Sequence, residues 1–203
     1  MTEPSRTVEV ERKYDVDEGT LLPDWTAIPG VDAVSPGEHR ALDARYLDTA
    51  DGTLARAGVA VRRRSGGPDE GWHIKGPRQG DGRVEQGWPL GSEEVPTAVR
   101  AAIAAWTTAP LEPLARIEND RTAYLLTGPD GVVAEFVDDH VRATDLRSGT
   151  RRAWREWEVE LGPAGPSDDA ARATFFAAIE RAVHAAGGRE ASSDSKLARA
   201  LGF

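Results

Sequence analysis

Apolar and charged side chains alternate with a period of two along several short segments of the chain. In residues 8–16, Val8 and Val10 share one face, whereas Glu9 and Glu11 share the other. Such alternation is typical of a β-strand, so the pattern predicts a strand. Comparable segments are bounded by Gly, Pro and Asp residues that favour turns. The further predicted strands are residues 40–48, 59–64, 72–75, 83–90, 114–126, 132–141, a short one over 141–146, and 154–161.

Other segments show the spacing of an amphipathic helix. A short helix is predicted over residues 17–25, with Asp17 as its N-cap, and a last helical turn over residues 195–201. Pro96 opens another helix, whose apolar face carries Val99, Ile103 and Trp106. A further helix starts at Asp168 with Ser167 as its cap, and its buried face carries Phe175, Ile179 and Val183. About eight strands with turn-like links and flanking helices indicate one antiparallel α+β domain over residues 1–203, with its sheet curled towards a barrel.

Composition excludes several classes of protein. The chain has 203 residues and no cysteine, which excludes disulfide scaffolds, thiolate zinc sites and cysteine nucleophiles. Its net charge of −9 argues against a surface that coats nucleic acid. No segment is apolar enough to span a membrane, and the polar N-terminus is unlike a signal peptide. We therefore expect a cytoplasmic protein with neither a nucleic-acid nor a membrane partner.

Charged residues form rows on the predicted strands, because residues i, i+2 and i+4 point the same way. The rows are Glu9, Glu11 and Lys13; Arg62 and Arg64; Arg83 and Glu85; and Glu156, Glu158 and Glu160. A half-exposed sheet with its charges in water would show the same rows. Two features favour a lined cavity instead. The rows segregate by sign, and three carboxylates in one row repel one another unless a cation binds them.

A curled sheet with acidic rows on one side and basic rows on the other could hold a polyphosphate bridged by a divalent metal. Mg²⁺ and Mn²⁺ take carboxylate oxygens as ligands. The guanidinium fork of arginine matches two phosphate oxygens at once. The charged rows therefore predict a site for metal and phosphate inside the barrel.

Seven short motifs occur along nearly the whole chain. Their order is a more specific signal of a protein family than any one motif alone. They are Glu9-x-Glu11-x-Lys13, Arg45-Tyr46-Leu47-Asp48-Thr49, Val61-Arg62-Arg63-Arg64, Ile74-Lys75-Gly76-Pro77, Arg83-Val84-Glu85, Glu156-x-Glu158-x-Glu160-Leu161 and Ser195-Lys196-Leu197. In this order they resemble the CYTH superfamily, the triphosphate tunnel metalloenzymes, which include CyaB-type adenylate cyclases and thiamine triphosphatase-like proteins.

The resemblance implies an eight-stranded antiparallel β-barrel-like tunnel that binds a triphosphate with Mg²⁺ or Mn²⁺. The residues it implies for phosphate binding are Lys13, Arg62, Arg64, Lys75, Arg83, Arg116, Arg121 and Lys196. The catalytic residues it implies are Lys13, Arg62, Arg64 and Lys75. Tyr46 is a further catalytic candidate, which either assists near the phosphates or packs in the core. The residues it implies for metal binding are Glu9, Glu11, Asp138, Asp139, Glu158 and Glu160, with Glu85, Glu135 and Glu156 as supporting acids.

Two choices within this set depend on which strand face a residue occupies. Glu135 and Asp139 share a face of a regular strand, which favours Asp139 over its neighbour Asp138 unless a bulge exchanges them. Arg116 and Arg121 are an odd number of positions apart and so lie on opposite faces of a regular strand, and we favour Arg121. His73, between Trp72 and Ile74 on a predicted strand, is interpreted as an ordinary strand residue.

Three functions remain open from the sequence. The preferred one is metal-dependent hydrolysis of a triphosphate, with inorganic tripolyphosphate ahead of thiamine or nucleoside triphosphates because no base-binding site is evident. The second is a class IV-type adenylate cyclase that makes cyclic AMP from ATP. The third is a non-catalytic polyphosphate-binding module, against which the acidic rows argue. The sequence fixes neither the oligomeric state nor whether a further domain follows.

Overall fold

A computed structural model describes residues 3–193 and 195–203. Its strands are β1 (Ser5–Val16), β2 (Ala33–Val34), β3 (Glu38–Asp48), β4 (Ala60–Ser65), β5 (Gly71–Gln79), β6 (Gly82–Pro89), β7 (Glu112–Gly128), β8 (Gly131–Asp145), β9 (Arg151–Leu161) and β10 (Arg189–Glu190). Its helices are the 3₁₀ turn η1 (Trp25–Ala27), α1 (Thr53–Arg56), α2 (Thr97–Ile103), α3 (Asp169–Ala186) and α4 (Lys196–Leu201). None of the helices in these residues is long and apolar enough to cross a membrane.

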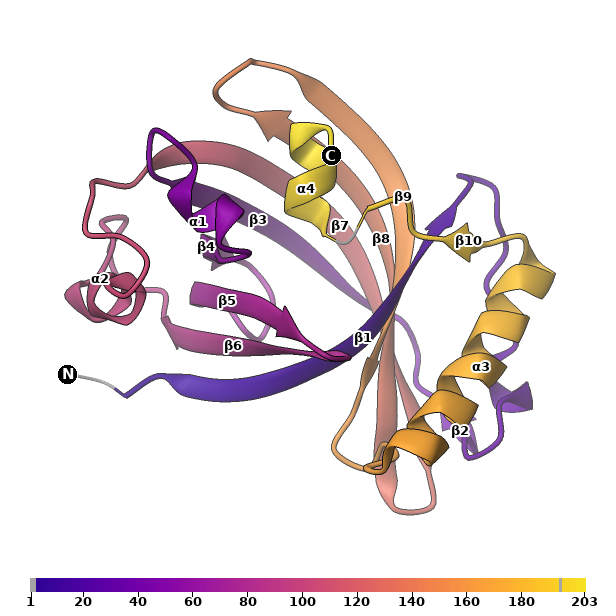
Figure 1. The fold of residues 1–203 in the computed structure, drawn as a ribbon. Helices are drawn as coiled ribbons and strands as arrows, with labels where there is room; N and C mark the ends of the chain where they lie inside the picture. Colours follow the sequence, from indigo (N-terminus) through magenta and orange to yellow (C-terminus); the bar gives the residue numbers. More distant parts are fainter. Residues whose placement is uncertain (1–2, 194) are drawn as a thin grey trace.

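Eight of these strands close into an antiparallel barrel (Figure 1). Their order is β1-β6-β5-β4-β3-β7-β8-β9, and β9 pairs back onto β1. The short strands β10 and β2 extend the edges of β1 and β7. The α+β class and the eight-stranded antiparallel tunnel predicted from the sequence are therefore confirmed.

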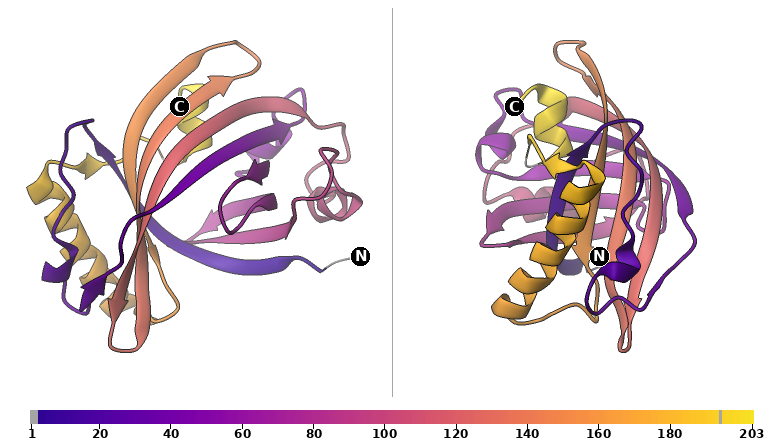
Figure 2. Two further views of the ribbon diagram at one scale, coloured as in Figure 1. Left: turned by 180° about the vertical axis from the view of Figure 1, so that it is seen from behind. Right: turned by 90° about the vertical axis from the view of Figure 1, so that its right-hand side faces the viewer.

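The largest apolar core lies outside the barrel, where α3 covers the outer faces of β1, β8 and β9 (Figure 2). Tyr14, Phe136 and Trp157 supply aromatic side chains from the three strands, and α3 contributes Phe176 and Ile179. Because neighbouring residues on a strand point to opposite faces, the same packing turns the charged rows inward. The apolar rows seen in the sequence thus form the outer wall of a charged tunnel.

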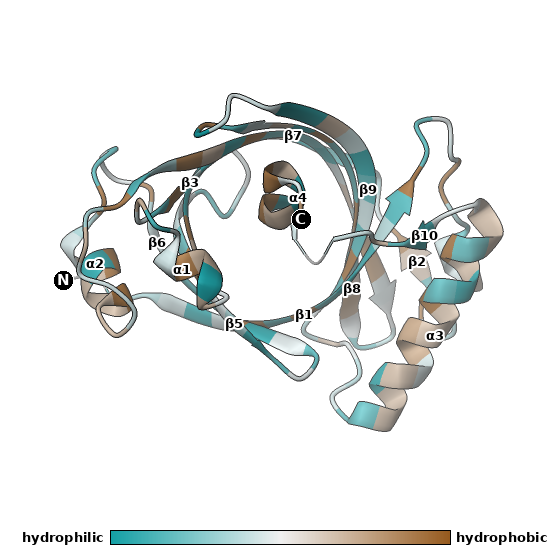
Figure 3. Ribbon diagram, turned by 45° about the horizontal axis from the view of Figure 1, so that its top comes forward, coloured by the Kyte–Doolittle hydropathy of each residue, from teal (hydrophilic) through white to brown (hydrophobic). Residues whose placement is uncertain are grey.

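Helix α4 lies within the ring of strands and closes one end of the barrel (Figure 3). The inner faces of β3, β7 and β8 carry small residues there, including Ala44, Ala115 and Ala143, against which Ala200 of α4 is buried. Small side chains leave the space that a helix needs inside the barrel. Lys196 begins α4, so this packing brings its side chain into the tunnel.

Several predicted elements differ from the observed ones. The helix expected over residues 17–25 is wrong: within it, Gly19 and Pro23 disfavour a helix, and η1 begins only at Trp25. The two strands expected over 132–141 and 141–146 are one, β8.

The ends of two helices also need correction. Asp168 rather than Ser167 caps α3, because the Asp168 carboxylate accepts a hydrogen bond from the amide of Ala171 at 2.8 Å. Helix α2 ends at Ile103, which leaves Trp106 beyond it and 38% exposed instead of on a buried face.

Candidate functional site: a charged tunnel

The barrel encloses a cavity of about 150 Å³ whose lining is mostly charged. Its basic lining residues are Lys13, Arg40, Arg62, Arg64, Lys75, Arg83, Arg121 and Lys196. Its acidic lining residues are Glu9, Glu11, Asp69, Glu135, Glu158 and Glu160. The basic groups therefore outnumber the acidic ones by two (eight against six). The cavity can attract an anion although the whole chain carries a net charge of −9.

Arg62 on β4 and Lys75 on β5 point into the tunnel and share one acidic partner. The Arg62 guanidinium lies 3.2 Å from the Glu85 carboxylate, and the Lys75 ammonium also lies 3.2 Å from it. Lys75 further contacts Glu9 at 2.5 Å, and Arg62 donates to the Tyr46 hydroxyl at 3.4 Å. Burial raises the pKa of Glu85, but Arg62 and the other neighbours outweigh it and hold that pKa well below its usual range. Glu85 is therefore a fixed counter-charge for the basic rows.

The positive charge of Arg64 lies in unfavourable surroundings. Burial, together with the positive charges of Arg62 and Arg121, lowers the pKa of Arg64 to about 9. Its salt-bridge partner, Asp69, is a loop residue whose side chain is 59% exposed. Because a guanidinium stays protonated in proteins, these unfavourable interactions persist at neutral pH. A bound anion would relieve them.

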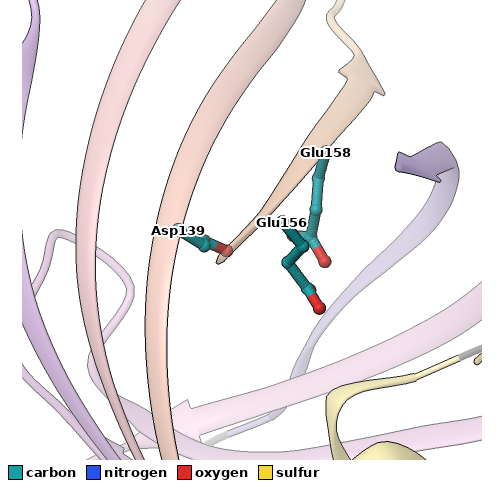
Figure 4. Close-up of side chains that lie close together, drawn as sticks. All are labelled: Asp139, Glu156 and Glu158. Atoms are coloured by element: carbon teal, nitrogen blue, oxygen red, sulfur yellow. The ribbon is translucent and has the colours of Figure 1, made fainter. Parts of the chain in front are cut away.

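An acidic cluster lies on β8 and β9 near α4 (Figure 4). Asp139, Glu156 and Glu158 each bring a carboxylate oxygen within 4.8 Å of the others. The Lys196 ammonium contacts all three, at 2.7, 2.5 and 2.7 Å respectively. Burial opposes its charge, but these carboxylates raise the pKa of Lys196 well above its usual value. The cluster is thus built to hold a positive charge, and the ammonium of α4 supplies one.

Two of the remaining tunnel carboxylates, Glu9 and Glu160, are less well compensated, whereas burial of Glu11 is outweighed by Lys13, which lowers the pKa of Glu11. Glu11 and Glu160 are directly opposite each other where β1 pairs with β9. Among the described residues, no salt bridge includes Glu160. Burial, with the nearby charge of Glu11, raises the pKa of Glu160 to about 7. Burial also raises the pKa of Glu9 to about 8, and a hydrogen bond with Glu85 adds to the effect. Crowded oxygen donors with raised pKa values fit a hard divalent cation.

The two aspartates on β8 lie on opposite sides of the barrel wall. Asp139 is fully buried inside, where Arg121 donates to it at 2.8 and 2.7 Å. Asp138 faces outward, and it accepts hydrogen bonds from Arg155 and from the indole of Trp157. The ladder between β8 and β9 runs without a bulge here, so strand alternation holds. The prediction of Asp138 as a metal ligand is therefore corrected.

The two arginines on β7 separate in the same way. Arg121 points into the tunnel and contacts Glu158 at 2.9 Å as well as Asp139. Arg116 lies on the outer surface, where it pairs with Asp43 at 2.8 Å and its side chain is 41% exposed. Since residues five apart on a regular strand occupy opposite faces, the prediction of Arg116 as a phosphate-binding residue is wrong.

The other predicted residues line or border the tunnel. The Lys13 ammonium contacts Glu11 at 2.8 Å and also Glu158. Arg83 faces the cavity, but its guanidinium donates to the backbone carbonyls of Gly76 and Gly58 at 2.6 and 2.9 Å. Those donors are engaged within the protein. Arg83 is therefore a weaker candidate for phosphate binding than its neighbours.

Three residues that were not predicted to belong to the site from the sequence also lie in the tunnel. Arg40 on β3 and Asp69 on the β4–β5 loop line the main cavity. His73, interpreted as an ordinary strand residue, places its Nδ1 2.6 Å from the Glu85 carboxylate and its Nε2 3.0 Å from the carbonyl of Asp69. None of these three residues lies in one of the seven sequence motifs. Their parity along the strands was the only sequence signal that could have marked Arg40 and His73.

A second cavity, of about 460 Å³, adjoins the first at the end of the barrel away from α4. The two cavities share five lining residues: Glu9, Arg40, Asp69, Glu135 and Glu160. Ser5 of β1 and Pro163 beyond β9 line its outer part. Because α4 occupies one end of the barrel, we interpret this second cavity as the entrance to the tunnel.

The raised pKa values predict how the stability of the ligand-free protein varies with pH. Between the unfolded pKa of 4.5 and the folded values of about 8 for Glu9 and about 7 for Glu160, the folded protein binds more protons than the unfolded chain. Stability must then fall as pH rises through this window. From pH 7 to 9, the loss is about 1–2 kcal/mol, or roughly 3–6 °C in Tm.

Thermal unfolding of the protein without metal, measured at pH 7, 8 and 9, checks this prediction. Above pH 7 the lowered pKa of His73 no longer contributes, because its ordinary value of 6.5 has been passed. The Glu9→Gln variant should lose most of the slope, since an amide does not titrate. A Tm that is flat or rising over this range would contradict the raised values.

Comparison with known proteins agrees with this geometry. The model of the CYTH domain family matches residues 7–190. Two Mycobacterium tuberculosis proteins, "Uncharacterized protein MT2285" and "Uncharacterized protein Rv2226", are each 36% identical over 98% of the chain. The chain spans 41% of the length of these relatives.

Solved structures share the fold at low sequence identity. A Bacillus halodurans protein described as a candidate adenylate cyclase has a TM-score of 0.66 and 16% identity, covering 96% of this chain and 97% of that one. The protein HpAC1 from Hippeastrum, reported to have a dominant triphosphatase activity, has a TM-score of 0.56 and 13% identity, with 96% and 94% covered. PH1819 from Pyrococcus horikoshii has a TM-score of 0.56 and 13% identity, with 95% and 98% covered.

A closed antiparallel barrel with inward charged rows defines a tunnel protein, and the family match covers most of its length. The chain belongs to the CYTH family.

Proposed function

We propose that this protein is a divalent-metal-dependent triphosphatase that acts on a triphosphate held in the tunnel, with inorganic tripolyphosphate as the preferred substrate. One observation carries the proposal: the Nε atoms of Arg62 and Arg64 are buried without a hydrogen-bond partner among the described residues. Both side chains line a cavity with an excess of basic groups. Buried donors without partners are costly, so this arrangement favours a bound anion with many acceptor oxygens.

The acidic residues of the tunnel fit Mg²⁺ or Mn²⁺, because they offer oxygen donors only and two of them, Glu9 and Glu160, are incompletely compensated. Glu11, Glu158 and Glu160, with Glu9 next to them, would hold the ion. When bound, such an ion polarises a phosphoryl oxygen and lowers the pKa of a bound water. Asp139 and Glu156 already contact Lys196, so they support the site through that ammonium.

The basic side chains supply positioning and charge neutralisation, which account for most of the catalysis of phosphoryl transfer. Arg62 and Arg64 would grip phosphate oxygens with their forks, and Lys13 and Lys75 would act as point charges. Tyr46 is buried next to Arg62, whose charge outweighs burial and lowers the pKa of the hydroxyl. Tyr46 therefore orients Arg62 in this proposal.

The test is a panel of substrates: tripolyphosphate, thiamine triphosphate, ATP and GTP, each with Mg²⁺ and with Mn²⁺. Phosphate release that requires metal and is fastest with tripolyphosphate is the expected result. Cyclic AMP and pyrophosphate from ATP would show a cyclase instead. Tight binding of tripolyphosphate without turnover of any substrate would show a binding module, and no binding would overturn the proposed function.

Replacing Arg64 by lysine should separate a phosphate-binding role from a purely structural one. The ammonium keeps the charge but cannot span two phosphate oxygens. We expect kcat/KM to fall about ten- to hundredfold, which corresponds to about 1–3 kcal/mol. The ligand-free Tm should change little, because the crowded positive charge is retained.

Arg116→Lys is the matched control, because Arg116 is exposed outside the barrel and paired with Asp43. Its kcat/KM should stay within about twofold of the native value, as expected for a surface ion pair. Unchanged kinetics in Arg64→Lys would remove Arg64 from the site.

A further inference from the structure

Arg40 lies where the entrance cavity adjoins the main cavity. It is on the inner face of β3 and lines both cavities. Its side chain is 13% exposed, yet its carboxylate partners are set towards the entrance: Glu38 at 2.9 Å and Glu135 at 3.3 Å. The Glu38 side chain is 62% exposed. The three nitrogens of Arg40 donate to these two carboxylates, and because a pair with an exposed carboxylate contributes little to stability, a phosphate can compete with Glu38 for the guanidinium.

The register of the barrel places Arg40 directly opposite Arg121. The two residues are Cα partners in the ladder between β3 and β7, and both point into the cavity. Like charges directly opposite each other on a sheet are unfavourable unless a counter-charge lies between them. Arg121 is held from its other side by Asp139 and Glu158. The pair therefore presents two guanidinium groups to the same part of the tunnel.

Asn119 provides a second and independent sign of a ligand at this place. It precedes Arg121 by two residues on β7, lines the main cavity, and is only 6% exposed. Its side-chain oxygen has no hydrogen-bond partner among the described residues. An amide oxygen accepts hydrogen bonds and cannot bond to a phosphate oxygen, but rotating the amide by 180° puts its NH₂ group, a donor, at the same place in the anion cavity.

We propose that Arg40, Asn119 and Arg121 form a phosphate subsite across β3 and β7 that binds the end of the triphosphate nearest the entrance. Arg40 thereby supplies from β3 the second guanidinium that Arg116, turned outward, does not supply from β7. The proposal rests on the proposed function, because it assigns part of the same tunnel. It makes Arg40 a substrate-binding residue, with Glu38 as a carboxylate that competes with the phosphate for it.

The test measures tripolyphosphate binding by calorimetry, together with the ligand-free Tm, in native protein and four variants. Arg40→Gln should weaken binding about ten- to hundredfold, the range for a lost charge-assisted hydrogen bond, and Arg40→Lys should restore part of it. Glu38→Gln should strengthen binding about two- to threefold, because it removes a competing carboxylate. Arg45→Gln is the matched control, since Arg45 lies on the same strand but is exposed outside, and it should bind like the native protein.

The outcomes separate this inference from the proposed function. If native protein binds tripolyphosphate and both Arg40→Gln and Glu38→Gln bind it equally well, Arg40 is only an ion-pair partner and the subsite is overturned while the tunnel stands. If Arg40→Gln lowers Tm sharply, the tripolyphosphate binding of Glu38→Gln decides the question, because that variant alters only an exposed side chain. Stronger binding then supports the subsite, and unchanged binding overturns it. If native protein binds no tripolyphosphate with or without Mg²⁺, the proposed function fails and the subsite fails with it.

Discussion

Replacing Lys196 by methionine should lower the Tm of the ligand-free protein by about 10 °C or more. The variant removes the ammonium that contacts Asp139, Glu156 and Glu158 and leaves three buried carboxylates together. Breaking a buried ion pair by removing one partner costs about 3–5 kcal/mol. For a domain of this size, each kcal/mol of lost stability lowers Tm by roughly 2–4 °C, so this cost corresponds to the expected fall in Tm. Differential scanning calorimetry at pH 7.5 measures it.

Arg189→Met is the control for Lys196→Met, because it removes one positive charge from an exposed pair with Asp17. That variant should shift Tm by no more than about 1–3 °C. Millimolar Mn²⁺ should restore part of the stability lost in Lys196→Met, since the three carboxylates can then bind the ion. An unchanged Tm in Lys196→Met would show that the ammonium is not the counter-charge of this cluster.

Replacing Glu11 by glutamine should reduce metal-dependent turnover by about a hundred- to a thousandfold, the scale on which a group that stabilises the transition state acts. Glu11 is directly opposite Glu160 and contacts Lys13, so it is placed between the acidic row and the basic rows. The amide removes one anionic oxygen donor without changing the size of the side chain. The rate of phosphate release at saturating metal measures the effect.

The fold of Glu11→Gln should remain intact. Lys13 keeps its contact with Glu158, and the loss of one of two facing carboxylates reduces repulsion across the β1–β9 pairing. Its Tm should therefore fall far less than that of Lys196→Met, because Lys13 keeps a carboxylate partner. Glu93→Gln, on an exposed loop between β6 and α2, should retain full activity. Native-like metal-dependent turnover in Glu11→Gln would exclude Glu11 from the metal site.

The arrangement of the barrel could be predicted because strand alternation is a local property. Asp139 points inward, as the parity of its strand indicated, and Arg116 and Arg121 lie on opposite faces, as their spacing indicated, since β7 and β8 are regular around them. The helix expected over residues 17–25 failed for an equally local reason, because Gly19 and Pro23 disfavour a helix although Asp17 could cap one. Strand alternation thus predicted which residues face the tunnel, whereas a candidate N-cap alone did not predict the structure of residues 17–25.

Other parts of the site depend on contacts between distant segments. Arg40 and Arg121 are 81 positions apart, and only the register of β3 against β7 makes them partners. The burial of Lys196 follows from the packing of α4 inside the barrel, against Ala44 and Ala115, which no short motif records. A motif marks which residues matter along a strand, but it does not state which strand lies opposite.

The external position of the main core separates folding from chemistry in this chain. Tyr14 and Trp157, which are paired across the closing seam of the barrel, fix its register from outside, while Lys13 and Glu158 meet on the inside one residue away. A slip of one residue would expose the aromatic rings to the tunnel and the charges to α3, so apolar burial selects the register that assembles the site. The apolar force that closes the barrel therefore does not depend on which side chains face the tunnel, although a buried charge there, such as Lys196, needs its counter-charges. A wall of this kind allows the ligand preference of the tunnel to change through evolution while the architecture persists.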